Sequence, residues 1–213
     1  MRKDFFTLVL AAAATILTLT APAWAGDVQL PSFRMKLGIS LLKIDAGEVL
    51  VAAPLGSLVT IQPSILWDLP SIRMRAGIHY LADVSGNYGL LSLTGIGASA
   101  YFYPWGLSSS YEIGLDNVVY QKSRPGPYLY AGITPVNMSI SRPTIGNQAP
   151  ISFSALIFET MLAAGYDYPL SRNTVLFAEG GYRFGAATSN EQVNGAVRYS
   201  GLSIMLGFTI YYF

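Results

Sequence analysis

The chain has 213 residues, of which 52% are hydrophobic and only 12% are charged, and its formal net charge is +1. This balance gives no electrostatic support for nucleic-acid binding, because phosphates are held by a surplus of basic residues. The sequence contains no Cys, which excludes disulfide bonds and thiolate metal sites. So few charges would also be unusual for the surface of a soluble protein.

The first 25 residues have the parts of a secretory signal peptide. Arg2 and Lys3 give a positive start, residues 5–20 are apolar and uncharged, and residues 23–25 (AWA) form a small-residue cleavage signal. We therefore expect residues 1–25 to be a cleaved signal peptide and the protein to be exported.

The remaining chain, residues 26–213, is predicted to be one domain. It contains 11 basic and 11 acidic residues, because two bases and one acid fall in the signal peptide. After the signal, no run of 18 apolar residues predicts a spanning helix. A hydrophobic composition without such a helix is typical of a membrane β-barrel, which crosses the bilayer with strands.

The last stretch, residues 197–213 (VRYSGLSIMLGFTIYYF), has the composition of a strand and ends on an aromatic residue. The ends of soluble domains are usually polar and frayed, whereas the last strand of a barrel must pair with the first. This stretch therefore favours a barrel over a soluble secreted sandwich.

Alternating or apolar runs predict eight strands in total. In residues 32–42 and 72–81, for example, apolar side chains alternate with polar ones. The predicted strands are residues 32–42, 57–67, 72–81, 90–103, 127–139, 151–168, 174–185 and 197–213.

An even number of strands places both ends of the barrel domain on one side, which we expect to be periplasmic. The short turns after Trp67 and Tyr168 then lie on that side, and the polar loops lie outside, at residues 83–89, 140–150 and 186–196. The long segment 104–126 breaks this asymmetry, and we expect it to hold a short helix or an extra hairpin.

Three segments carry a resemblance to a known family: residues 166–170 (YDYPL), 181–184 (GYRF) and 211–213 (YYF). With the strand pattern, they resemble the small bacterial outer-membrane barrels of the OmpA/OmpX type. The resemblance implies an all-β fold, an eight-stranded antiparallel up-and-down transmembrane barrel in the outer membrane. It further implies that Tyr211 and Phe213 form a signal read by the barrel assembly machinery.

The same resemblance implies a set of partners and no single activity. The partners would be outer-membrane lipid and lipopolysaccharide, with no nucleic acid, no cofactor and a monomeric state. An inert structural or surface-interacting role is therefore the leading expectation.

The alternation gathers charged residues on one face of the strands. Because a charge facing lipid near the midplane costs about 2–4 kcal/mol, this face should line the lumen. An eight-stranded barrel is narrow enough for side chains to fill, so we expect a polar plug. The predicted lumen residues are Arg34, Lys36, Arg73, Arg75, Glu159, Glu179, Arg183 and Arg198.

Two alternatives remain open: a narrow pore, and a barrel that binds or modifies lipid A. If Phe213 faces lipid, the even-numbered apolar residues of the last strand face inward with Arg198, unless a bulge changes the register. An inward apolar face would form an acyl pocket. The set is Leu202, Ile204, Leu206, Phe208 and Ile210.

The single histidine, His79, is the only candidate for a general base. Asp83 and Ser85 follow it closely, and outer-membrane barrels that modify lipids use such groups. However, Ser and Asp are also common turn residues, and a lone lumen-facing His is more often a polar filler. We therefore predict no catalysis.

Overall fold

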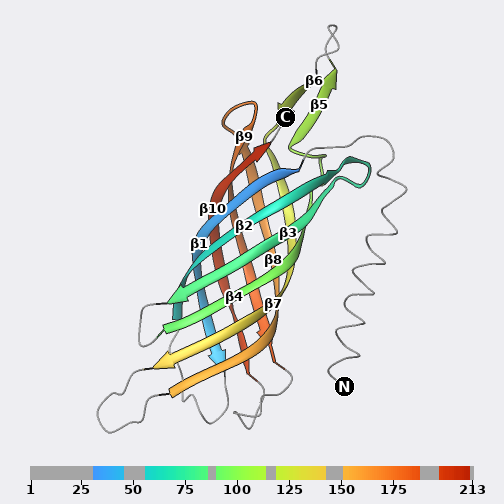
Figure 1. Ribbon diagram of the computed structural model, residues 1–213. Coiled ribbons are helices and arrows are strands. Elements are labelled where there is room, and N and C mark those ends of the chain that lie inside the picture. The colour runs from blue at the N-terminus through green and yellow to red at the C-terminus, as the bar shows by residue number, and fades with distance from the viewer. Residues whose placement is uncertain are drawn as a thin grey trace. The chain divides into compact units, whose positions relative to one another are not determined.

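The computed structural model describes residues 31–45, 56–85, 90–113, 119–142, 151–187 and 197–211. Eight long strands form one closed antiparallel barrel in the order β1-β10-β9-β8-β7-β4-β3-β2 (Figure 1). The predicted fold class is thus confirmed. The strands are β1 (Ser32–Asp45), β2 (Gly56–Leu69), β3 (Met74–Ser85), β4 (Leu90–Phe102), β7 (Gly126–Arg142), β8 (Ile151–Pro169), β9 (Thr174–Ala186) and β10 (Arg198–Tyr211).

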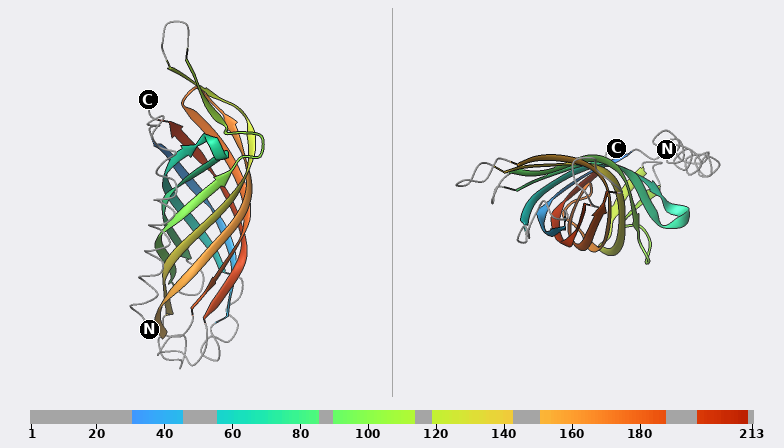
Figure 2. Two further views of the ribbon diagram at one scale, coloured as in Figure 1. Left: turned by 90° about the vertical axis from the view of Figure 1, so that its right-hand side faces the viewer. Right: turned by 90° about the horizontal axis from the view of Figure 1, so that it is seen from below.

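The barrel closes through the first and last strands. β1 and β10 pair antiparallel without interruption, from Ser32 opposite Tyr211 to Asp45 opposite Arg198. Figure 2 shows the tilted strands as one wall that curves around the lumen. Closure gives every barrel strand two neighbours, which is what an apolar surrounding requires of backbone N–H and C=O groups.

The outer surface of the wall is apolar. Leu37, Ile39 and Leu41 of β1 are 45–56% exposed, and Leu202, Ile204 and Leu206 of β10 are 60–68% exposed. The alternate residues of β1, such as Arg34, Lys36 and Ser40, face inward and are fully buried. The period-two alternation of these strands therefore separates an apolar outer face from a filled lumen.

The two ends of the barrel differ in their connections. At the turn end, where β1 begins and β10 ends, η3 (Pro70–Ile72) joins β2 to β3 and residues 170–173 join β8 to β9. At the opposite loop end, the strands lead into residues 46–55, 86–89, 143–150 and 188–196. These residues contain most of the predicted outer loops and lie outside the described residues.

The segment between β4 and β7 forms an extra hairpin, the second of the two predicted possibilities. β5 (Ser109–Ile113) and β6 (Val119–Ser123) pair as a separate two-stranded sheet at the turn end. The chain before the hairpin turns back over the lumen, and Tyr103 and Ser108 are almost fully buried there. Within the described residues, no helix is long and apolar enough to cross a membrane.

Candidate functional site

The lumen contains two groups of buried charges. Six of the eight predicted lumen residues belong to them, together with three carboxylates that the sequence analysis did not assign to the lumen. The turn-end network consists of Arg34, Lys36, Asp68, Arg75, Asp167 and Glu179. The loop-end triad consists of Asp83, Glu159 and Arg183.

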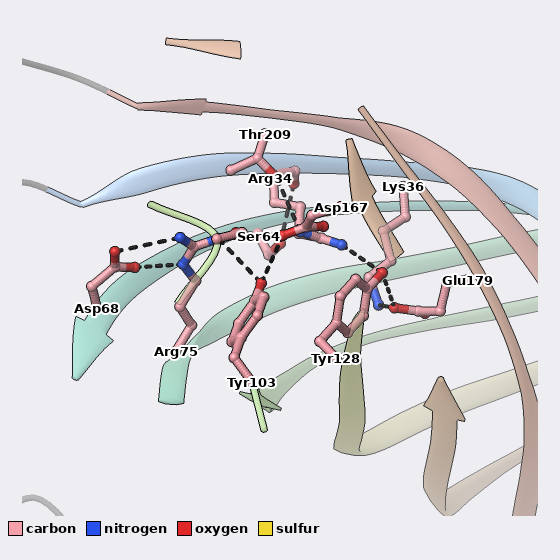
Figure 3. A network of polar contacts seen from close by, with 11 residues as sticks. Arg34, Lys36, Ser64, Asp68, Arg75, Tyr103, Tyr128, Asp167, Glu179 and Thr209 are labelled. Carbon is pink, nitrogen blue, oxygen red and sulfur yellow. Dashed lines mark hydrogen bonds and ion pairs between the residues drawn. The ribbon is translucent and has the colours of Figure 1, made fainter. Parts of the chain in front are cut away.

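Arg34 on β1 is the centre of the turn-end network (Figure 3). Its Nη1 lies 3.2 Å from Oδ1 of Asp167 and donates to Oγ1 of Thr209 at 3.0 Å. Its Nη2 donates to the hydroxyl of Tyr128 at 2.6 Å. These partners lie on β8, β10 and β7, so the guanidinium reaches across the lumen to the opposite wall.

Lys36, one inward position further along β1, pairs with Glu179 of β9. Its Nζ lies 2.7 and 3.0 Å from the two carboxylate oxygens. The Tyr128 hydroxyl donates to the same carboxylate at 3.1 Å and thereby joins this pair to Arg34. The network is therefore continuous from the turn end toward mid-barrel.

Arg75 and Asp68 form the outermost part of the network. Nε of Arg75 lies 2.6 Å from Oδ1 of Asp68, and Nη1 donates to the Tyr103 hydroxyl at 3.1 Å. Asp167 in turn accepts from Tyr103 at 3.0 Å and from Ser108 at 2.7 Å. Burial raises the pKa of Tyr103, which lies just beyond β4, so its hydroxyl stays protonated and donates. The segment before the hairpin is thus bonded into the charged lumen.

Aromatic rings enclose the cations of this network. The Arg34 guanidinium lies 3.6 Å from the ring centroid of Phe177, and Lys36 Nζ lies 3.4 Å from that of Tyr130. Arg75 lies 4.9 Å from the Tyr211 ring. Ring faces attract cations and exclude water, so the aromatic residues both fill the lumen and compensate part of the desolvation of the charges.

The loop-end triad depends on a single guanidinium. Arg183 donates to Glu159 through Nε at 3.2 Å and Nη2 at 2.6 Å, and Nη2 also donates to Asp83 at 2.5 Å. Its Nη1 reaches Ser40 at 2.8 Å and Thr60 at 3.3 Å. Arg183 on β9 therefore contacts β8, β3, β1 and β2.

Apolar side chains surround this triad. A cluster of buried residues fills the inward positions at the loop end, and we call it the loop-end apolar cluster. Tyr199, which belongs to it, also donates a hydrogen bond to Glu159. Its members are Leu42, Ile44, Leu58, Leu81, Leu91, Leu93, Val136, Met138, Ala155, Ile157, Ala187, Val197 and Tyr199.

Two predicted lumen residues lie elsewhere. Arg73 is exposed, because it is not in β3: it adopts a left-handed backbone conformation (φ 55°) that ends η3, and its side chain donates to the carbonyl oxygen of Pro104. Arg198 is exposed because it occupies an outward position of β10. Tyr211, predicted as an assembly signal, faces the lumen beside Arg75, and Phe213 lies outside the described residues.

The expectation for the last strand is wrong. The even-numbered residues Leu202, Ile204 and Leu206 are 60–68% exposed and face outward, while Ser203 and Met205 are buried. β10 pairs with both neighbours without a bulge, so its alternation is unbroken. The described residues of this strand therefore form no acyl pocket, and a cluster of inward apolar side chains lies at the loop end of the lumen instead.

The described hydrogen bonds of His79 do not include Asp83 or Ser85. Its Nε2 lies 2.7 Å from Oγ1 of Thr134, and its buried Nδ1 has no hydrogen-bond partner among the described residues. Asp83 is four residues further along β3, about 13 Å away at roughly 3.3 Å per residue, and is bonded to Arg183. Among the described side chains, no group of three or more His, Asp or Glu could hold a metal.

The three carboxylates that the sequence analysis did not assign to the lumen differ in how readily the alternation would have placed them there. Asp83 lies eight positions from Arg75, and Asp167 lies eight positions from Glu159, so even spacing on one strand places each pair on one face. Extending the alternation to the strand ends would therefore have found both. Asp68, at the end of β2, was assigned to a turn.

No protein-family model matches the chain, and no curated protein matches it. The chain is similar in structure to neisserial surface protein A, with 17% identity over 84% of this chain and 97% of that one and a TM-score of 0.48. It is also similar to the attachment invasion locus protein Ail of Yersinia pestis, in a complex with the heparin analogue sucrose octasulfate. Here the identity is 10% over 85% of this chain and 99% of that one, with a TM-score of 0.46.

A third similar structure is the N-terminal β-barrel domain of Pseudomonas aeruginosa OprF. Its identity is 15%, the alignment covers 85% of this chain and 99% of that one, and the TM-score is 0.42.

Proposed function

We propose that this chain is a monomeric outer-membrane barrel with a plugged lumen, whose role is structural or in surface interaction, without catalysis. The observation that carries the proposal is the reach of Arg183, which contacts four other strands of the wall with one guanidinium. A side chain that touches such separated strands occupies the cross-section of the lumen.

The turn-end network supports the same proposal at a second level of the barrel. Arg34 reaches three other strands, and the rings of Phe177 and Tyr130 lie against the cations. Tyr103 and Ser108 cover this level from the turn end. An ion entering from either end would have to break buried, charge-assisted hydrogen bonds, each worth more than a neutral one.

The outer surface supports the membrane location. The exposed side chains of the wall are largely Leu, Ile, Val, Phe and Tyr, which in water would form an apolar patch far larger than soluble monomers expose. The cleaved signal peptide (residues 1–25) and the recognition of Tyr211 and Phe213 by the assembly machinery remain predictions. So does the placement of the polar loops on the outside.

A conductance measurement separates the plugged barrel from the narrow pore. The purified protein, reconstituted in planar bilayers, is expected to give no sustained conductance above the lipid background in 1 M salt. A large porin in the same lipids serves as the positive control. Discrete, stable channel openings by the folded protein would contradict the plug and favour the pore.

The same preparation tests catalysis. Incubation with lipopolysaccharide, followed by mass spectrometry of the lipid, is expected to leave its acyl chains unchanged. A modification that disappears in His79→Ala would establish the enzymatic alternative, although Thr134 is the hydrogen-bond partner of His79 among the described residues.

A further inference from the structure

Two exposed basic side chains lie together at the loop end of the closing strands. Lys43 of β1 and Arg198 of β10 both occupy outward positions, like the apolar side chains that precede Lys43 on β1 and follow Arg198 on β10. The register places Lys43 opposite Ser200, two positions from Arg198. Diagonal neighbours of this kind are about 7–8 Å apart between Cα atoms, so two long side chains can reach one group.

An apolar column below the two bases sets their depth in a membrane. On β1 it runs from Phe33 to Leu41, which is about 26 Å along the strand at roughly 3.3 Å per residue. At a typical tilt of about 40°, this corresponds to about 20 Å along the barrel axis, close to the apolar band of about 25 Å. Lys43 is the next outward residue and therefore lies at the headgroup level.

The exposed charges that the structure describes on the outer surface have one sign. Among the described side chains, the exposed charged residues are all basic, because the carboxylates lie in the lumen or, for Asp68, half-buried at its end. At the loop end, the outward-facing charges of the described side chains are Lys43 and Arg198 alone. A pair of cations directly above an apolar column is complementary to a lipid that carries phosphate on its headgroup.

We propose that Lys43 and Arg198 bind a phosphate group of lipid A in the outer leaflet. This inference rests on the proposed outer-membrane location, with the loop end outside. It gives the lipopolysaccharide contact a defined place on the barrel, the seam between β1 and β10. The Lys43 ammonium and the Arg198 guanidinium would donate to the phosphate oxygens while the apolar column packs against the acyl chains.

The register also places Asp45 opposite Arg198. A carboxylate at this position would repel a phosphate, so charge complementarity makes a second, opposite prediction. Removing the acid in Asp45→Asn should strengthen lipid A binding, whereas removing the bases should weaken it. Opposite effects of neighbouring neutral substitutions cannot arise from a general loss of folding.

The test is native mass spectrometry of the folded protein in detergent, titrated with bisphosphorylated lipid A in the presence of a chelator. Lys43→Gln with Arg198→Gln is expected to weaken binding about 25-fold, from about fivefold for each charge. The matched control is Arg124→Gln with Arg172→Gln, which removes two exposed arginines at the turn end and should change binding less than twofold. Asp45→Asn should strengthen binding about fivefold.

Two further ligands identify the source of the phosphate. Dephosphorylated lipid A should bind weakly and equally to wild type and to the double variant. Inorganic phosphate at millimolar concentration should not displace lipid A, because it lacks the acyl chains. Equal binding of lipid A by wild type and the Lys43/Arg198 variant, or displacement by inorganic phosphate, would overturn the proposal. Conductance and heat-dependent gel mobility report separately on the plugged barrel, so these outcomes would leave the proposed function standing.

Discussion

The two ends of the lumen bury charges in different ways. The turn-end network balances three cations against three carboxylates, and several groups have more than one partner: Asp167, for example, accepts from Arg34, Tyr103 and Ser108. The loop-end triad has one cation and two carboxylates, surrounded by apolar side chains. The first arrangement is redundant, whereas the second depends on Arg183.

This difference matters because buried ion pairs contribute asymmetrically to stability. Forming such a pair gains little over an apolar packing, but removing one partner leaves an uncompensated charge and costs about 3–5 kcal/mol. In the turn-end network, tyrosine and serine hydroxyls can still bond a carboxylate that loses its cation. In the triad, Glu159 would keep the Tyr199 hydroxyl, but Asp83 would have no hydrogen-bond partner left among the described residues. Redundancy should therefore protect the turn end, but not the loop end, against loss of its central arginine.

The largest expected effect comes from comparing the two central arginines. Arg183→Met should lower the free energy of unfolding by about 3–5 kcal/mol, because Asp83 and Glu159 lose their common partner. Arg34→Met should cost less, about 1–3 kcal/mol, because Asp167 keeps its hydroxyl donors. Urea unfolding in phospholipid vesicles measures both. Equal costs would show that the two ends are equally redundant.

Neutralising one carboxylate at each end tests the charge balance. Glu179→Gln should cost about 3 kcal/mol, because it leaves Lys36 buried without a counter-charge. Asp83→Asn should cost less than about 1 kcal/mol, because Arg183 retains both bonds to Glu159 and the triad becomes neutral. The same unfolding assay applies. If Asp83→Asn lowered the free energy of unfolding more than Glu179→Gln does, the triad would have to tolerate its second negative charge.

The smallest expected effect concerns the segment that covers the turn end. Ser108→Ala removes one of the donors to Asp167 and should cost about 1 kcal/mol. The matched control is Ser203→Ala, which should lower the free energy of unfolding by a similar amount. Ser203 is buried in the opposite half of the barrel and forms a hydrogen bond with Ser40. Only the Ser108 variant should increase proteolysis of the hairpin between β4 and β7. Unchanged proteolysis would indicate that Ser108 does not hold this segment in place.

Local patterns were sufficient for the architecture. Alternating and apolar runs placed the eight barrel strands within a few residues of their observed bounds, because a barrel wall separates lipid from lumen at every residue. The same alternation put Arg34, Lys36 and Arg183 on the inner face, where the structure has them. Composition and the aromatic last strand correctly indicated a closed barrel.

The sequence by itself determined which faces of most strands are polar, since that information repeats every two residues. Only the tertiary structure decided which charges meet, because closure brings together residues as distant as Arg34 and Asp167, 133 positions apart. The face of β10 was misassigned from Phe213, since both of its faces lack charge between Arg198 and the end, and its pairing with β1 and β9 resolved it. Arg73 was wrongly predicted to face the lumen for a similar reason, because a residue in a left-handed turn does not follow the alternation of the strand.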